Sequence, residues 1–137
     1  MSERTLHRAV CDYIRLQYPD VIFNTDLSGA TKLTVGQAVA LKSLRSGRGF
    51  PDIVIYEPRK DYHGLFLELK QEGERLFNKK GELATPHLRE QNDMLCRLED
   101  KGYCSGFVVG FDQAKIVIDN YLKITDKWKL EKKLSEL

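Results

Sequence analysis

Two acidic residues and a lysine stand at the ends of two neighbouring strand-like segments. Asp52 opens the run DIVIYE, and Glu68 and Lys70 close the run LFLELK. An antiparallel hairpin centred near residue 61 brings Asp52 opposite the end that carries the other two. Two carboxylates beside an ammonium group form a site for a hard divalent cation, since Mg²⁺ prefers carboxylate and carbonyl oxygen. The spacing therefore predicts a site for Mg²⁺, or for Mn²⁺ in its place.

The same three side chains suit the hydrolysis of a phosphodiester bond. A bound metal ion neutralises the phosphate and lowers the pKa of a water molecule. A lysine can orient that water or stabilise the negative charge that grows on the phosphorus. Each residue alone also has an ordinary explanation, because a strand with leucines inward and a Glu/Lys pair outward is common, and Asp often follows proline in a turn. The convergence of the two segments favours the catalytic interpretation.

Two further polar residues stand where a helical stripe predicts apolar ones. Glu3 lies three residues before Leu6, so it continues the inward face of a helix expected over 3–17. Gln91 lies within the apolar stripe of a helix expected over 86–102. Glu3 has the alternative of complementing the helix dipole, and Gln91 that of a hydrogen bond in the core. If both helices pack on the hairpin, both side chains point at its two carboxylates.

These residues in this order resemble a known family. GFPD, then fifteen residues, then ELK, with a helical Glu upstream and a helical Gln downstream, is similar to the PD-(D/E)XK nucleases. Within them the chain resembles the VRR-NUC family, the virus-type replication and repair nuclease domain, especially its stand-alone phage and prophage members. The resemblance extends from Glu3 to about Leu122. It implies an α/β fold of the restriction-endonuclease type, with a mixed central sheet flanked by helices.

The resemblance also implies a role for each site residue. Asp52 and Glu68 bind the metal ion together with the backbone carbonyl of Leu69. Lys70 serves the attacking water. Glu3 assists at the metal from the first helix, directly or through a water molecule. The catalytic set that it implies is Asp52, Glu68, Lys70, Glu3 and Gln91.

The activity implied by the resemblance is that of a Mg²⁺- or Mn²⁺-dependent DNA endonuclease. The expected substrate is a Holliday junction or other branched DNA, as in DNA repair, and the expected location is the cytoplasm of a bacterial or phage-infected cell. A homodimer with two symmetric sites suits a junction with paired strands to cut. The alternatives are a nuclease for flaps, single strands or RNA, and a silent nucleic-acid-binding module with the same fold.

Basic residues near the expected site could bind DNA phosphates. The stretch 28–48 is longer than a minimal core of this fold needs, and its helix is expected to serve substrate or partner. The segment 71–84 is polar and has two glycines, so we expect a mobile loop. A Lys-rich tail follows residue 122, although a charge run is more often a solvated face. The expected DNA contacts are Arg45, Arg48, Arg75, Lys79 and Lys80.

The order of apolar segments predicts one α/β domain over residues 1–137, with a core over about 3–122 and a helical tail over 123–137. Thr34 and Gln37 have the spacing of a capping box. Thr85 followed by Pro86 is a typical helix start. The expected helices cover 3–17, 35–46, 86–102 and a segment capped by Asp112, and the expected strands cover 21–27, 52–57, 65–70 and 103–110.

The composition excludes some classes of protein. Apolar residues make up 42% of the chain and charged residues 31%, the balance of a globular domain. The net charge of +2 does not by itself indicate nucleic-acid binding. The three cysteines and three histidines show no metal-ligand spacing, so a zinc enzyme is not expected. We expect the cysteines to be free thiols, buried or partly buried.

Overall fold

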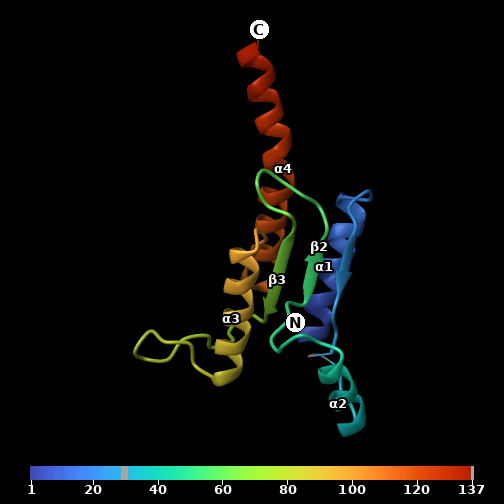
Figure 1. Cartoon of the computed structure of the whole chain (residues 1–137), viewed down its shortest axis with the longest axis vertical. Coiled ribbons are helices and arrows are strands. Elements are labelled where there is room, and N and C mark those ends of the chain that lie inside the picture. The colour runs from blue at the N-terminus through green and yellow to red at the C-terminus, as the bar shows by residue number, and fades with distance from the viewer. Residues whose placement is uncertain (29–30, 137) are drawn as a thin grey trace.

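The helices and strands follow one another in the order that the sequence predicts. The computed structural model describes the backbone of residues 1–28 and 31–136 and the side chains of residues 1–28 and 31–123. Figure 1 shows the elements along the chain: α1 (Glu3–Gln17), β1 (Phe23–Thr25), α2 (Val35–Ser43), β2 (Ile53–Ile55), β3 (Leu65–Lys70), α3 (Pro86–Asp100), β4 (Cys104–Val109) and α4 (Gly110–Glu136).

The four strands form one mixed sheet in the order β1-β2-β3-β4. The pairs β1–β2 and β2–β3 are antiparallel, and β4 lies parallel to β3. In the β2–β3 hairpin Ile53 is paired with Leu67 and Ile55 with Leu65. One step beyond Ile53 this register brings Asp52 to the level of Glu68. The predicted hairpin is therefore confirmed, and with it the mixed sheet.

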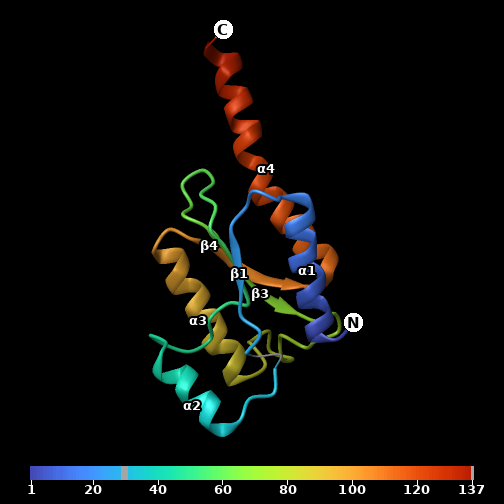
Figure 2. The same cartoon turned by 90° about the vertical axis from the view of Figure 1, so that its right-hand side faces the viewer.

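Helices cover both faces of the sheet (Figure 2). Helices α1 and α4 contact each other and β3 on one face, and α3 packs against β4 on the other. Alternation along β3 sends Leu65, Leu67 and Leu69 into the core beneath α1 and α4. The side chains of Glu68 and Lys70 point the other way, toward α3, and are buried there. The apolar core and the two charged side chains thus lie on opposite faces of the same strand.

Local signals explain where the two helices nearest the site begin. The hydroxyl of Ser2 accepts the Thr5 N–H at the start of α1. At the start of α3 the hydroxyl of Thr85 accepts the Leu88 N–H, and Pro86 occupies the first turn, as expected. Both helices bury an apolar stripe against the sheet. Each therefore carries its N-terminal half toward the end of the hairpin.

Some bounds differ from those predicted. Strand β1 has three residues rather than the seven of 21–27, because it pairs only with the three residues of β2. Helix α2 ends at Ser43, short of 46. Helix α4 begins at Gly110, so Asp112 lies in its first turn and does not cap it. The Val109 N–H instead donates to the side chain of Gln113.

Helix α2 stands apart from the sheet at the foot of the molecule (Figure 1). Its capping box between Thr34 and Gln37 is present, as predicted. None of the described residues of α2 is buried, and Val35 and Val39 are exposed. After α2 the chain turns back toward the sheet, and Arg45 lies on this return. Within the predicted insertion, the described residues 31–48 therefore add an arm to the core.

The expected loop after β3 has internal structure. Phe77 and Leu83 form an isolated antiparallel bridge, and the Asn78 side chain accepts the N–H groups of Lys80 and Glu82. The loop projects from the base of α3 (Figure 1). The backbone of the tail is helical to Glu136, and the lysine side chains after Lys123 lie outside the described residues.

The state of the cysteines agrees only in part with the expectation from composition. The described cysteines are free, but Cys96 is exposed, contrary to expectation. This residue faces outward from α3, while Cys11 is buried and Cys104 partly buried. Within the described residues, no helix offers an apolar stretch long enough to cross a bilayer.

Gly49 gives a test of how α3 is held against the segment that leads to Asp52. Its φ is +78°, and a Cβ atom there would lie 2.8 Å from the Glu90 carbonyl oxygen and 2.9 Å from the Gln91 nitrogen. Gly81 has a similar φ of +80°, but a Cβ there would meet none of the described atoms within 4 Å. Both Gly→Ala changes carry the strain of a left-handed residue, about 1 kcal/mol. We expect Gly49→Ala to lower the free energy of unfolding by about 1 to 3 kcal/mol more than Gly81→Ala, because only Gly49→Ala displaces backbone.

Urea denaturation of both variants measures that difference. Equal losses of unfolding free energy in the two variants would mean that the segment leading to Asp52 can move away from α3 without loss of stability.

Candidate active site

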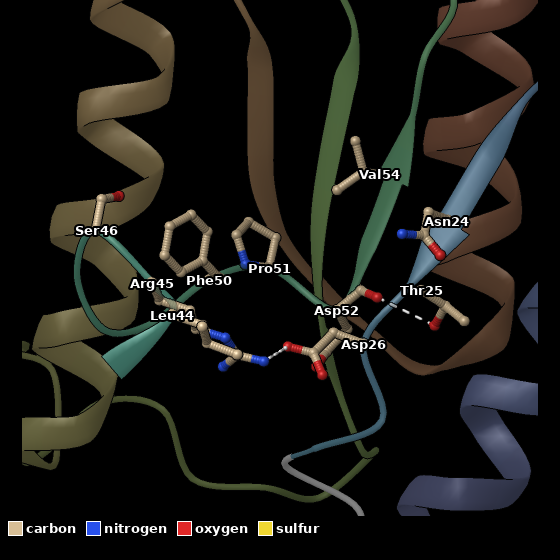
Figure 3. Close-up of a pocket in the computed structure, with 10 residues that line it drawn as sticks. All are labelled: Asn24, Thr25, Asp26, Leu44, Arg45, Ser46, Phe50, Pro51, Asp52 and Val54. Atoms are coloured by element: carbon tan, nitrogen blue, oxygen red, sulfur yellow. Dashed lines mark hydrogen bonds and ion pairs between the residues drawn. The ribbon is translucent and has the colours of Figure 1, made fainter. Parts of the chain in front are cut away.

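Asp52 is held by the strands on both sides of it. Its side-chain Oδ2 accepts the Leu69 N–H of β3 at 2.8 Å. Its carbonyl oxygen accepts the Asp26 N–H at 2.8 Å and the Thr25 hydroxyl at 3.1 Å, the latter drawn in Figure 3. Strand β1 therefore fixes the backbone of Asp52, and β3 fixes its carboxylate.

Gln91 joins the other two charged groups. Its Nε2 donates to Glu68 Oε1 and its Oε1 accepts from Lys70 Nζ, both at 2.8 Å. The amide can point only one way, because a carboxylate accepts and an ammonium donates. The relative exposures of Glu68, Gln91 and Lys70 are 3%, 6% and 7%, so this arrangement is shielded from water. The predicted inward phase of Gln91 is correct.

Burial disfavours the charged forms of both carboxyl groups. Burial, and next the Asp52 carboxylate, raise the pKa of Glu68 far above its ordinary value. Burial also raises the pKa of Asp52, although hydrogen bonds with Glu68 and the Leu69 N–H oppose the rise. Among the described residues no partner reaches Glu68 Oε2, a buried oxygen. A proton shared by the pair, or a cation, relieves this repulsion.

Glu3 lies at the edge of the site. Its side chain is exposed, yet partial burial and then the charges of Asp52 and Glu74 raise its pKa, while Lys70 lowers it. In the described part of the chain, no three His, Cys, Asp or Glu side chains stand close enough together to hold a metal ion. Direct ligation by Glu3 beside Asp52 and Glu68 is therefore not supported. A contact through water fits its position.

A buried histidine, His7, supports Asp52 from behind and was not among the predicted site residues. The Nε2 atom of His7 is hydrogen-bonded to the Thr25 hydroxyl, which in turn donates to the Asp52 carbonyl. Burial lowers the pKa of His7, and the charges of Asp52 and Asp26 oppose this. A neutral imidazole with its proton on Nε2 satisfies the geometry. Its position four residues after Glu3, on the same helix face, is the signal that was missed.

A cleft of about 520 Å³ opens beside Asp52. Figure 3 shows Arg45 on its wall, with the guanidinium paired to the Asp26 carboxylate at 2.7 Å. Phe50 and Pro51 form another part of the lining. Arg45 is the predicted DNA contact that the structure brings to the cleft.

The other predicted DNA contacts do not line this cleft. Arg48 lies 3.7 Å from Glu90 on α3. Arg75 donates to the carbonyl of Phe77 within the projecting loop. Lys79 and Lys80 are exposed at the turn of that loop. The structure thus separates the expected basic residues into one at the cleft, one paired with α3 and three on the loop.

Comparison with known proteins identifies the fold. The sequence matches no protein-family model and no curated protein. A solved structure described as a "VRR_NUC domain protein" is similar over 90% of each chain, with a TM-score of 0.65 and 23% sequence identity. The chain has the VRR_NUC fold. The predicted α/β class and the resemblance on which it rested are confirmed, and at this level of identity the chemistry has to follow from the side chains.

The site of this VRR_NUC fold suits a divalent cation. Glu68 Oε2 is buried without a hydrogen bond from any described residue, and it faces a second carboxyl group whose pKa is also raised. Carboxylate oxygens are the ligands that Mg²⁺ and Mn²⁺ prefer. Asp52 and Glu68, with the Leu69 carbonyl and water, are the groups that would hold it.

The raised pKa of Glu68 has a consequence for stability. A carboxyl group with a higher pKa in the folded chain stabilises it below the unfolded pKa, ordinarily 4.5, and this contribution is lost as the pH rises toward the folded pKa. Glu68→Gln mimics the protonated side chain. Without divalent cations we expect the variant to gain stability relative to the unaltered chain as the pH rises from about 5 to about 8, by up to about 1.4 kcal/mol per pH unit.

Thermal unfolding at both pH values measures this gain, with the exposed Glu99→Gln as the matched control. Adding Mg²⁺ should stabilise the unaltered chain at the higher pH and leave Glu68→Gln unchanged. A pH-independent difference would show that Glu68 is ionised without penalty.

Proposed function

We propose that the chain is a metal-dependent endonuclease that hydrolyses phosphodiester bonds in DNA, with Mg²⁺ as the cofactor and Mn²⁺ as a substitute. The observation that carries the proposal is the convergence of Asp52, Glu68 and Lys70 at one end of the hairpin. Gln91 strengthens it by linking Glu68 to Lys70. The VRR_NUC fold supports a nuclease over an unrelated hydrolase.

Each side chain has a distinct part in the proposed reaction. Asp52 and Glu68 supply carboxylate oxygens, and Glu3 acts from the edge through water. When bound, the cation supplies charge neutralisation at the phosphate and a more acidic water. Lys70 has three N–H donors, of which Gln91 takes one. The others can orient the attacking water and stabilise charge on the phosphate oxygens.

Branched DNA, such as a Holliday junction, is the proposed substrate on the strength of the resemblance. A homodimer, with two sites for paired cuts, is proposed on the same ground. A homodimer would have an apolar surface to cover on the α2 arm, formed by the exposed side chains of Val35, Val39 and Leu44. Flaps, single strands and RNA are the competing substrates, and a panel of all four distinguishes them.

Cleavage should depend on the carboxylates. Asp52→Asn should slow Mg²⁺-dependent nicking of DNA by at least about 10³-fold, because it removes a charged ligand worth several kcal/mol in the transition state. Asp61→Asn makes the same chemical change at an exposed position in the turn between β2 and β3, and it should leave the rate unchanged. Rates are measured on supercoiled plasmid and on a junction substrate.

Cleavage by purified Asp52→Asn at the rate of the unaltered chain would contradict the assignment of the site. Absence of cleavage by the unaltered chain on every substrate, with DNA binding retained, would favour the silent binding module.

Lys70 should matter to the rate more than to the metal ion. Lys70→Met keeps most of the aliphatic stem and removes the ammonium group. In the unaltered chain the Lys70 Nζ lies 5.9 Å from the centre of the Phe107 ring. We expect cleavage to fall by about 10²-fold or more. Affinity for Mg²⁺, measured by calorimetry, should hold or rise, because a positive charge near the cation is lost. Equal losses of rate and metal affinity would give Lys70 a structural role.

A further inference from the structure

A basic groove that the sequence did not indicate runs between α1 and β1. It has a volume of about 430 Å³, and Arg4, Arg8 and Arg15 lie along it. No acidic side chain is among the described residues that line it. Its hollow form and single sign of charge distinguish it from the scattered lysines of the loop after β3. The groove suits an extended anion.

The three arginines share one face of α1. Arg8 lies four residues after Arg4, and Arg15 lies seven residues after Arg8, so all three project on the same side. At 1.5 Å per residue they span roughly 16 Å along the helix. One DNA strand carries a phosphate about every 3.4 Å of the helix axis, so the row covers the rise of about five phosphates.

Contacts between α1 and β1 give the groove a fixed floor. The Arg15 guanidinium lies over the Phe23 ring, 5.8 Å from its centre. Farther along, the buried His7 is hydrogen-bonded to the Thr25 hydroxyl. An aromatic contact at one end and a buried hydrogen bond at the other hold the helix against the edge strand. The floor of the groove is therefore held in place by contacts within the folded domain.

The groove leads to the active-site cleft. Thr25 lines both hollows, and its hydroxyl donates to the Asp52 carbonyl at 3.1 Å. Figure 3 shows Thr25 between the cleft and the ribbon of α1. A strand that leaves the arginine row at Thr25 thus arrives beside Asp52. This continuity gives the row a direction relative to the chemistry.

We propose that this groove binds the sugar-phosphate backbone of the DNA strand whose scissile phosphate lies at Asp52. The inference deepens the proposed nuclease function and rests on it. Guanidinium groups bind phosphate through paired N–H donors, and the fork of Arg suits this better than the point charge of Lys. The groove holds the strand without reading its sequence, which agrees with a substrate chosen by shape.

Asp12 does not block the groove. It is paired with Arg8 at 3.4 Å and with Arg15 at 2.8 Å. The side chains of Arg8 and Arg15 are 79% and 61% exposed, and exposed pairs of this kind contribute little stability. Three arginines and one aspartate leave a net charge of +2. Each guanidinium has five donors, so it can keep Asp12 and still bind phosphate.

The salt dependence of DNA binding tests the groove separately from cleavage. The probe is fluorescein-labelled duplex DNA in EDTA, followed by anisotropy from roughly 50 to 200 mM salt. The variant is Arg4→Gln with Arg8→Gln, and the matched control is Lys60→Gln with Lys101→Gln, two exposed residues at the opposite end of the β2–β3 hairpin. Each lost phosphate contact lowers the slope of log K against log salt by about 0.9, so we expect a decrease of about two in the arginine variant. The control should keep the slope of the unaltered chain.

Three results would each overturn the proposed role of the groove. They are an unchanged slope in the arginine variant, an equal change of slope in the control, and no binding of DNA by the unaltered chain. Cleavage by the unaltered chain together with an unchanged slope would leave the nuclease standing and reject the groove. A lowered slope in a chain that cuts no DNA would support the groove and reject the nuclease.

Discussion

The hydrogen bond from the Leu69 N–H to Asp52 Oδ2 joins the end of β2 to the end of β3. It forms only in the register that pairs Ile53 with Leu67, since a slip of one residue would turn every side chain of β3 to the other face. That register sends the leucines to α1 and α4, and leaves Glu68 facing α3. The core and the site are therefore specified by the same pairing, and neither can change alone.

Placing two carboxyl groups in this position is unfavourable for the folded chain by itself. Burial disfavours their charged forms, and Glu68 Oε2 has no compensating donor among the described residues. The Leu69 N–H and the Gln91 amide offset part of the cost. Lys70 adds attraction without direct contact with Glu68, because Gln91 stands between them, and its Nζ lies 3.9 Å from Glu74 Oε1. A divalent cation would remove the repulsion that remains. Binding of a cation would therefore explain why a core of this size tolerates two buried carboxyl groups.

The parts of the molecule that the sequence could predict depend on local patterns. Alternation in LFLELK predicted the faces of β3, and the stripe of α3 predicted the inward phase of Gln91. The same argument was wrong for Glu3, which is exposed at the first turn of α1. Helical spacing places His7 four residues after Glu3, but its hydrogen bond with Thr25 could not be predicted, because it needs α1 and β1 to meet at one particular offset. The pairing of Arg45 with Asp26 joins two segments on either side of the α2 arm, whose path no periodicity records. Local signals find the charged groups that converge at the site, and tertiary contacts decide which others support them.

The close approach of Gly49 to α3 determines how much of this site can be moved to another protein. The segment from Gly49 to Asp52 rests on the backbone of α3 next to Gln91, so the carboxylate at its end is positioned partly by a helix that follows the hairpin. A hairpin grafted alone would carry the three charged groups and lose the surface that sets their approach. The shortest portable unit runs from β1, which fixes the Asp52 backbone, through α3, with β4 to seat that helix. Moving this site to another protein therefore means exchanging the sheet together with α3.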